Sequence, residues 1–377
     1  WHTETSMPLY IGLMSGTSLD GIDAALVRCG EDRPEWLGAT GLPFSAALHD
    51  DLLALCLARE VSFAELARLE TAFCERQAEA VNRLLLETGT PREAITAIGS
   101  HGQTIEHAPN ATPAHTYQLD NPSLLAELTG CAVVGDLRRR DLAAGGQAAP
   151  LAPAFHAALF TASEAYRLVL NLGGIANLTR LPPSGQDAPV VGFDTGPANM
   201  LMDAWSQRHL GHPYDADGAW AASGRVDDAL LARLLDDDYF SRLPPKSTGR
   251  EHFHLDWLTS RLSGQESPCD VQATLAELTA ASIAMGVTQC SAGVSTAYDA
   301  LIPCGGGAHN ADLLTRIQRH LPEIPLTPCE RFGWSPDWLE AGAFAWLAHQ
   351  RVAGLPGNLP DVTGARGPRV LGGLYAS

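Results

Sequence analysis

Residues Tyr10–Val27, which read YIGLMSGTSLDGIDAALV, contain two apolar runs separated by a short turn of small polar residues. The first run ends at Met14, the turn is Ser15-Gly16-Thr17-Ser18, and Ile22–Val27 follows with strand character. Two such runs around a glycine-containing turn predict a β-hairpin. Glycines let a backbone approach an anion, and N–H and hydroxyl groups donate to phosphate oxygens. The turn is therefore a candidate phosphate site, with contributions expected from Gly16, Thr17, Ser18, Leu19, Asp20, Gly21, Ile22 and Asp23.

The carboxylates of this turn suit a metal ion. Mg²⁺ at a phosphate site keeps most of its waters and takes one or two carboxylates, so Asp20 is the expected Mg²⁺ ligand, with Asp23 nearby. A strand follows the turn and the sequence lacks G-x-x-x-x-G-K-[ST], so this is not a Walker-type loop. It is typical instead of the hairpin loop of actin, hsp70 and sugar kinases. A purely structural turn is the alternative, although such turns rarely combine two hydroxyls, two glycines and two carboxylates.

Composition argues against several classes of partner. Over 377 residues, 43 acidic residues outnumber 25 basic ones and give a net charge of −18. This charge disfavours nucleic acid and anionic membranes, because phosphate backbones are bound by clustered Lys and Arg. The eight cysteines form no C-x-x-C pair, so reduced thiols and a cytoplasmic location are expected. No apolar stretch approaches the ~20 residues of a membrane span. Trp1–Ser6 resembles a remnant before a natural start at Met7 and does not enter the fold prediction.

A second glycine turn occurs in the other half of the chain. Leu168–Leu172 reads as a strand that enters Gly173-Gly174 and continues as a second strand to Thr179. One strand–turn–strand unit in each half predicts an α/β protein of two related lobes with a nucleotide cleft between them. We expect residues 7–145, completed by a helix near 336–350, to form the N-terminal lobe, and residues 146–335 to form the C-terminal lobe. The second turn taken alone would read as structural; as one of a pair, it contributes the phosphate-binding candidates Gly173, Gly174 and Asn177.

Asp194 lies between a strand predicted over 189–193 and a helix predicted over 200–209. Ligands of α/β folds gather at the carboxyl ends of strands. Asp194 is therefore a candidate general base, provided that it comes within ~3 Å of the proton it takes. The alternative is an N-cap of the following helix, which is a common role of Asp. Gly196 and Asn199 in the same segment are candidate substrate contacts.

Other polar segments extend the predicted site. Gly305-Gly306-Gly307 follows a buried strand and precedes a helix, a place where adenosine would lie against bare backbone. In the first half, His101, Gln103 and Asp136 lie in polar, glycine-punctuated strand ends and are candidate substrate contacts, although such a His is more often structural. Two basic segments stay undecided: Arg138-Arg139-Arg140 is a local anion site or a salt-bridged turn, and Lys246–Arg250 contacts a phosphate or faces water.

These pieces, in this order, resemble the anhydro-N-acetylmuramic acid kinases, a family of the hexokinase, hsp70 and actin superfamily. The sequence departs from the family pattern at Ala148, where glycine is usual in G-G-Q-G-A-P, and at Ala198, where glycine is usual in D-T-G-P-G-N. Both changes put local backbone angles in doubt but not the activity. The matching segments cover essentially the whole chain from Met7: Gly12–Asp23, Ser100–Thr104, Gln118–Pro122, Gly135–Pro153, Asn171–Thr179, Gly192–Trp205, Tyr214–Gly218, Pro245–Phe253, Asp270–Thr274, Pro303–Asn310 and Gly333–Phe344.

The resemblance implies a two-lobed, ribonuclease H-like fold of the actin-like ATPases and a kinase of cell-wall recycling. Members of the family convert 1,6-anhydro-N-acetylmuramic acid, ATP and water to N-acetylmuramic acid 6-phosphate and ADP. Because O6 of the anhydro sugar carries no proton, a water attacks the anomeric carbon as the bridge opens. Carried over to this chain, Asp194 activates that water and residues 16–23 hold ATP phosphates and Mg²⁺. Arg138 or Arg139 binds the lactyl carboxylate or a phosphate, and a homodimer is expected.

Two other functions stay open. The first is an ordinary sugar or carboxylate kinase of the same fold, in which Asp194 deprotonates a substrate hydroxyl directly. The second is an actin- or hsp70-like ATPase that binds protein partners, although the sequence shows no appended peptide-binding domain and no long filament-type insertion.

Overall fold

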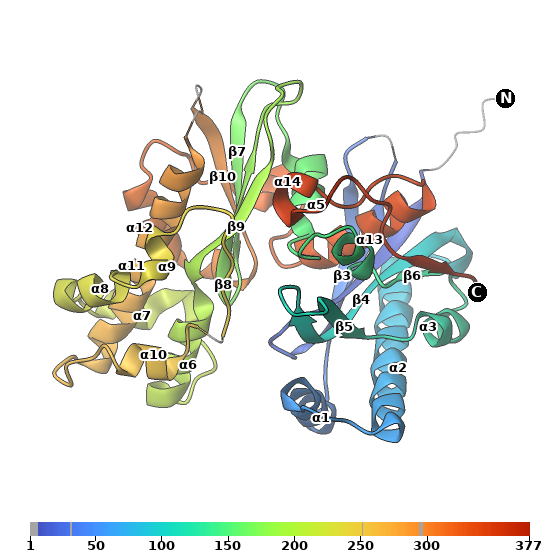
Figure 1. The fold of residues 1–377 in the computed structure, drawn as a ribbon, viewed down its shortest axis with the longest axis horizontal. Coiled ribbons are helices and arrows are strands. Elements are labelled where there is room, and N and C mark those ends of the chain that lie inside the picture. Colours follow the sequence, from blue (N-terminus) through green and yellow to red (C-terminus); the bar gives the residue numbers. More distant parts are fainter. Residues whose placement is uncertain (1–6, 31, 251, 293, 295–296) are drawn as a thin grey trace. The chain divides into compact units, whose positions relative to one another are not determined.

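The computed structural model describes residues 7–30, 32–250, 252–292, 294 and 297–377 (Figure 1). The expected remnant at residues 1–6 lies outside the described residues. The chain divides into two compact units. Unit 1 comprises the described residues up to Leu159 together with Trp338–Ser377, and unit 2 comprises Phe160–Asp337.

Unit 1 is built on a mixed sheet whose strands run in the order β11-β6-β4-β1-β2-β3, with β5 paired to β4. The predicted hairpin is present, because β1 and β2 pair antiparallel from Leu9↔Arg28 to Met14↔Asp23. Strand β4 lies parallel to β1 on its other side. The strands are β1 (Leu9–Ser15), β2 (Gly21–Arg28), β3 (Glu35–Pro43), β4 (Ile95–Ala108), β5 (His115–Leu119), β6 (Val133–Gly135) and β11 (Gly373–Tyr375).

The two faces of this sheet are covered in different ways. On one face, Ile11 and Leu13 pack into an apolar core with Phe73 and Leu84 of α2. On the other face, helix α13 approaches the strands so closely that a Cβ at Gly12 would meet the Ala341 carbonyl oxygen at 1.8 Å. The helices of unit 1 are α1 (Ala46–Leu57), α2 (Phe63–Thr88), α3 (Pro122–Thr129), α4 (Arg139–Ala143), α5 (Ala152–Phe160, whose last residue belongs to unit 2), α13 (Leu339–Val352) and α14 (Pro360–Thr363), with a 3₁₀ turn at Arg92–Ala94.

Unit 2 contains a four-stranded sheet in the order β10-β7-β8-β9. Its core gathers around α11, most of whose residues are buried. The strands are β7 (Tyr166–Leu172), β8 (Ile175–Leu181), β9 (Val191–Pro197) and β10 (Tyr298–Cys304). The helices are α6 (Asn199–Leu210), α7 (Ala219–Ser223), α8 (Asp228–Leu235), α9 (Asp238–Ser241), α10 (Leu255–Thr259), α11 (Pro268–Cys290) and α12 (Ala311–His320), with 3₁₀ turns at Ala216–Gly218, Gly306–His309 and Cys329–Phe332.

The two sheets share one topology. In unit 1, the antiparallel series β1-β2-β3 has β4 parallel to its first strand. In unit 2, the antiparallel series β7-β8-β9 has β10 parallel to its first strand. The repeated arrangement confirms the predicted α/β fold of two related units.

The division between the units differs from the predicted one. It falls at Leu159/Phe160 instead of after residue 145. The reason is the buried Asp141, whose Oδ2 accepts from the Ala148 backbone at 2.8 Å and whose Oδ1 accepts from Asn358 and Thr363, each at 2.7 Å. These bonds tie the segment after residue 145 to the C-terminal tail within unit 1.

Two strands continue further than the sequence predicted. Ser100–Thr104 lies inside β4 and not at a strand end, and Asp194 lies inside β9, which continues to Pro197. Among the described residues, no helix combines the length and hydrophobicity that crossing a lipid bilayer requires.

Candidate active site

The glycine turn of unit 1 is held in place by Gln103 of β4. Ser15 Oγ donates to Gln103 Oε1 at 2.6 Å, and Gln103 Nε2 donates to the Gly16 carbonyl at 3.3 Å. Leu19 is buried at a left-handed φ of 59°, and its N–H donates to the Gly16 carbonyl. Thr17, Ser18 and Asp20 are exposed on the outside of the turn.

The glycines of the turn have different roles. A Cβ at Gly16 would have only Ser18 Oγ within 4 Å, at 3.8 Å, so nothing within the chain requires glycine there. A Cβ at Gly21 would meet the Leu42 carbonyl oxygen at 2.4 Å, so Gly21 is needed for the pairing of β2 with β3. Ile22 is buried in the core. The free space at Gly16 therefore suits a ligand, whereas Gly21 and Ile22 serve the fold.

Metal ligands do not cluster at the turn. Within the part of the chain that the structure describes, no three His, Cys, Asp or Glu side chains form a group that could hold a metal ion. Asp20 is exposed, and Asp23 lies half-buried in β2. This donor set fits an ion such as Mg²⁺ that takes one or two carboxylates and completes its coordination with water and phosphate oxygens.

His101 and Arg138 form one buried pair in unit 1. Arg138 Nε and Nη2 lie 3.1 and 2.9 Å from His101 Nε2, and Arg138 Nη1 donates to the Ala148 carbonyl at 2.7 Å. Burial and the neighbouring guanidinium hold the pKa of His101 well below its usual range, and burial lowers the pKa of Arg138 to about 10. The neutral imidazole thus accepts from Arg138, as a structural His does.

Asp136 and Arg139 lie apart from this pair, on an open groove of unit 1 of about 840 Å³. Arg139 Nε is 3.7 Å from Asp136 Oδ1, and its guanidinium stacks 5.2 Å from the Tyr117 ring. Arg140, Arg351 and Arg369 line the same groove. Of the three consecutive arginines, Arg138 therefore points into unit 1, whereas Arg139 and Arg140 lie on a cationic surface.

In unit 2, the second glycine turn caps a helix. The carbonyls of Gly173 and Gly174 accept from the first N–H groups of the α6 segment, at Ala198, Asn199 and Met200, over 2.9–3.1 Å. Asn199 Nδ2 donates to the Leu172 carbonyl at 2.9 Å. The start of α6 is thus satisfied by the turn itself.

Asp194 lies in the edge strand β9 and is held at several atoms. Its Oδ1 accepts from Asn177 Nδ2 at 2.9 Å and its Oδ2 accepts from the Thr248 N–H at 3.0 Å. The N-cap of α6 is Ala198, without a side-chain cap. The alternative role of Asp194 as a helix cap is therefore wrong.

The glycines after β10 also divide into two kinds. A Cβ at Gly306 would have no atom within 4 Å, whereas a Cβ at Gly307 would meet Leu172 Cβ at 2.6 Å. Gly305 has a left-handed φ of 76°. Gly196, which the sequence suggested as a substrate contact, instead has Phe240 Cε1 2.8 Å from its Cβ position and is required by packing.

The segment Lys246–Thr248, which the sequence left undecided, belongs to the Asp194 site. The Lys246 carbonyl accepts from the Asp194 N–H at 3.1 Å. Lys246, the only lysine of the sequence, has its Nζ 4.9 Å from the Tyr239 ring centre. Burial, and then Arg242, lower the pKa of Lys246 to about 8. The sequence feature that could have indicated this segment is that its lysine is the single lysine of a chain rich in arginine.

Asp120 of unit 1 was not predicted from the sequence as a functional residue. Both of its carboxyl oxygens and Gln77 Oε1 are buried without a hydrogen-bond partner among the described residues. Burial raises the pKa of Asp120 to about 7, and the side chains of Ser100 and Gln77 lie beside it. The sequence feature that could have indicated Asp120 is its position between a strand, β5, and Asn121, the N-cap of α3.

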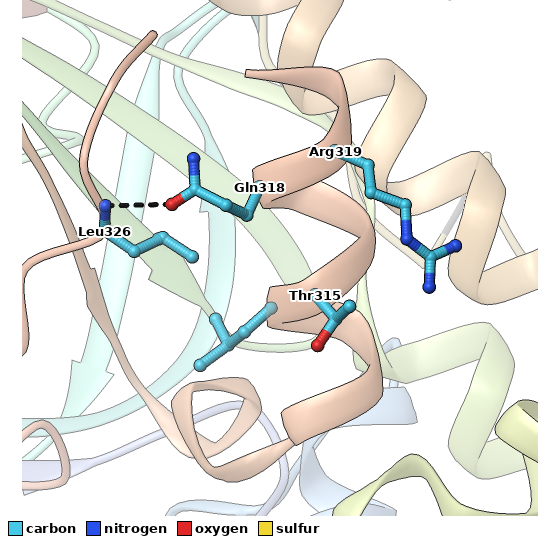
Figure 2. Close-up of a pocket in the computed structure, with 5 residues that line it drawn as sticks. Thr315, Gln318, Arg319 and Leu326 are labelled. Atoms are coloured by element: carbon cyan, nitrogen blue, oxygen red, sulfur yellow. Dashed lines mark hydrogen bonds between the residues drawn. The ribbon is translucent and has the colours of Figure 1, made fainter. Parts of the chain in front are cut away.

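A separate hollow in unit 2 contains none of the predicted residues. Figure 2 shows it on α12, where Thr315, Gln318 and Arg319 lie with Leu326 from the following segment. Gln318 Oε1 accepts from the Leu326 N–H at 3.2 Å and closes one side.

Known proteins of one family match almost the whole chain. The model of the family "Anhydro-N-acetylmuramic acid kinase" matches residues 8–377. A protein of that name from Chromohalobacter salexigens is 99% identical over 370 residues, which cover 98% of this chain and 100% of the relative. Another from Xanthomonas axonopodis pv. citri is 52% identical over 98% of both chains. Among solved structures, the ADPNP-bound activator of 2-hydroxyisocaproyl-CoA dehydratase from Clostridium difficile aligns with 92% of this chain and 96% of its own at 13% identity and a TM-score of 0.47.

Proposed function

The chain belongs to the anhydro-N-acetylmuramic acid kinase family, and we propose that it phosphorylates 1,6-anhydro-N-acetylmuramic acid while opening the anhydro bridge. ATP and water are the other substrates, and N-acetylmuramic acid 6-phosphate and ADP are the products. The reaction belongs to the recycling of peptidoglycan. The single observation that supports this chemistry best is the carboxylate of Asp194, oriented by a separate donor on each oxygen.

Asp194 acts as the general base in this proposal. It takes a proton from a water whose oxygen bonds to the anomeric carbon. The bond between that carbon and O6 breaks, and O6 takes the γ-phosphoryl group. N–H donors favour the ionised form of a carboxylate and fix its orientation, and a general base needs both before the substrate arrives.

Glycine segments are the proposed nucleotide-binding groups. In unit 1, the backbone at Gly16, Thr17 and Ser18 takes phosphates, since Gly16 leaves open space for a ligand. In unit 2, Gly173 and Gly174 take phosphates and Gly306 lies against the adenosine. Positioning and charge neutralisation are the main contributions a protein makes to phosphoryl transfer.

Asp20 is the proposed Mg²⁺ ligand. When bound, Mg²⁺ neutralises developing charge on the phosphates. On the sugar side, Arg139 is the better candidate for the lactyl carboxylate, because its guanidinium lies on an open groove, whereas Arg138 is engaged by His101 and Ala148. A cytoplasmic homodimer completes the proposal, and light scattering of the purified chain tests the dimer.

The test is to run the reaction in ¹⁸O-labelled water with the anhydro sugar and ATP, and to locate the label by mass spectrometry. We expect one ¹⁸O at the anomeric hydroxyl and none in the phosphate. Plain N-acetylmuramic acid serves as the comparison substrate. Phosphorylation of the open sugar alone would instead establish an ordinary sugar kinase, and ATP hydrolysis without any sugar requirement would establish a protein-binding ATPase.

A further inference from the structure

The pairing of β8 with β9 contains one irregularity, and it lies at the proposed base. Ala176 is opposite Gly196, but the next residue, Asn177, is opposite Asp194. Thr195 is therefore an extra residue on β9, as in a β-bulge. Bulges re-aim side chains and are frequent next to active sites. Without the extra residue, Asn177 would lie opposite Thr195.

This register brings a donor to the carboxylate. Asn177 Nδ2 donates to Asp194 Oδ1 at 2.9 Å, and the Thr248 N–H donates to Asp194 Oδ2 at 3.0 Å. The main chain of Asp194 is fixed as well, because its N–H donates to the Lys246 carbonyl at 3.1 Å and its carbonyl accepts from Tyr239 Oη at 2.7 Å. Donors to a carboxylate favour the ionised form.

We propose that Asn177 is a positioning residue for Asp194 and not a ligand of the nucleotide. The inference rests on the proposed function, in which Asp194 is the base. The amide nitrogen of Asn177 is the group that would otherwise approach a phosphate, and it is engaged by the carboxylate. The bulge at Thr195 sets this contact, and the Thr248 N–H supplies a donor that side-chain substitution does not remove.

Other charged groups lie on the elements around β9. Tyr239 and, beside it, Arg242 and Lys246 lie on the side of α9. Arg180 on β8 donates to the Cys290 carbonyl, and Glu277 on α11 is paired with Arg316 and His320. Burial, and then the charge of Asp194, raise the pKa of Tyr239, so it stays a neutral donor. The pKa of Lys246 is about 8, so its titration does not overlap with the acid limb of the pH profile of kcat/KM.

The experiment compares Asn177→Ala and Asn177→Asp with the unsubstituted protein. The first removes the donor, and the second places a like charge against Asp194. We expect the acid limb of the pH profile of kcat/KM to move upward by about one pH unit for Asn177→Ala and further for Asn177→Asp. Activity should recover to within about tenfold at high pH, because the base then ionises without help. The KM for ATP should stay within about twofold.

A second readout does not need activity. The ¹³Cγ resonances of labelled aspartate are titrated in the free protein, and the resonance missing in Asp194→Asn identifies the carboxyl. We expect its midpoint to rise in both Asn177 variants. Gln318→Ala is the matched control, because it removes a hydrogen-bonded side-chain amide from unit 2 outside the site, and it should move neither the midpoint nor the acid limb.

The possible results separate the two ideas. A raised KM for ATP with an unmoved acid limb and an unmoved ¹³C midpoint would overturn the inference and return Asn177 to the nucleotide site. A raised midpoint together with an active Asp194→Asn variant would support the positioning contact and overturn the assignment of Asp194 as base.

Discussion

Ser15 at the end of β1 and Gln103 inside β4 are joined by a hydrogen bond of 2.6 Å between Oγ and Oε1. The same amide donates through Nε2 to the Gly16 carbonyl. One side chain from the neighbouring strand thus fixes both the entry and the first glycine of the proposed phosphate turn. The sequence predicted Gln103 to be a substrate contact, whereas in the structure its side chain holds the turn in place.

Replacing Gln103 should loosen the turn and weaken nucleotide binding. Gln103→Ala removes the two hydrogen bonds to the turn, each worth about 1 kcal/mol, so we expect the Kd for an ATP analogue to rise about tenfold. Isothermal titration calorimetry checks this. Ser15→Ala removes one of the two bonds and should have a smaller effect. An unchanged Kd in Gln103→Ala would show that the turn keeps its shape without Gln103.

Substitutions at different glycines should affect either nucleotide binding or folding. Gly16→Ala and Gly306→Ala place a Cβ where the chain leaves space, so both variants should fold with an unchanged Tm and lose at least about tenfold in nucleotide affinity. Gly12→Ala and Gly307→Ala, whose Cβ would meet backbone or Leu172, should fail to fold or lose several degrees in Tm. Unweakened nucleotide binding in the first pair would remove the argument for ligand approach at these glycines.

Asp194→Asn should abolish most of the turnover while nucleotide binding persists. A general base contributes about 10²–10⁴-fold, so kcat should fall by that factor, and the Kd for an ATP analogue should change less than about twofold. Steady-state kinetics and calorimetry measure the two quantities. Retained activity would mean that another group accepts the proton of the water.

Ala148→Gly should stabilise the protein. Ala148 is buried at a left-handed φ of 59°. This conformation costs a residue with a Cβ about 1–2 kcal/mol. Glycine avoids that cost but loses about 0.5–1 kcal/mol of stability, because its unfolded chain has more conformational freedom. We expect a net gain of about 0.5–1 kcal/mol in the free energy of unfolding. Ala144→Gly is the control in the same segment, because its φ is −81°, and it should be destabilising. Equal losses from both variants would argue that no strain is stored at Ala148.

Asp120 should make stability depend on pH. Its pKa is about 7 in the folded protein against 3.8 ordinarily, so the folded state binds the proton more tightly. The stability it contributes is full below pH 4 and is lost as the pH rises to about 7, up to about 4 kcal/mol. Asp120→Asn removes the charge and keeps the size of the side chain beside Ser100 and Gln77.

Urea unfolding at pH 5 and pH 8 measures this effect. The Asn variant should be more stable than the unsubstituted protein at pH 8, and its stability should vary less between the two pH values. Asp32→Asn, on the exposed surface, should leave the difference unchanged. If the Asn variant kept the full pH dependence, the raised pKa would have to belong to another group.

The sequence predicted secondary structure correctly where the local residue pattern agrees with the element that forms in the fold. The hairpin of β1 and β2 was evident from its glycine turn, and the helix over 63–87 from its apolar spacing; the structure has both. Strand β3 went unpredicted, because Glu35–Pro43 contains two glycines and shows no alternation of apolar and polar residues. Its place is set by pairing with β2, a tertiary effect.

The candidate site was predicted by residue type more than by role. Asp194 was identified, but the contact of Asn177 with its carboxylate depends on a bulge at Thr195 that no local sequence pattern predicts. Arg138 and His101 are 37 positions apart in sequence and meet only in the folded unit. Asp120 was not predicted, because the burial that raises the pKa of its carboxyl group arises only in the folded unit.

The single lysine, Lys246, is a natural site for an NMR label. Reductive methylation with ¹³C-formaldehyde would label only Lys246 and the N-terminal amine. Because Lys246 lies over the Tyr239 ring, ring-current shifts would give its dimethylamine an NMR signal of its own. That signal would follow the segment holding Asp194 during turnover, in a protein of 377 residues, without introducing any mutation.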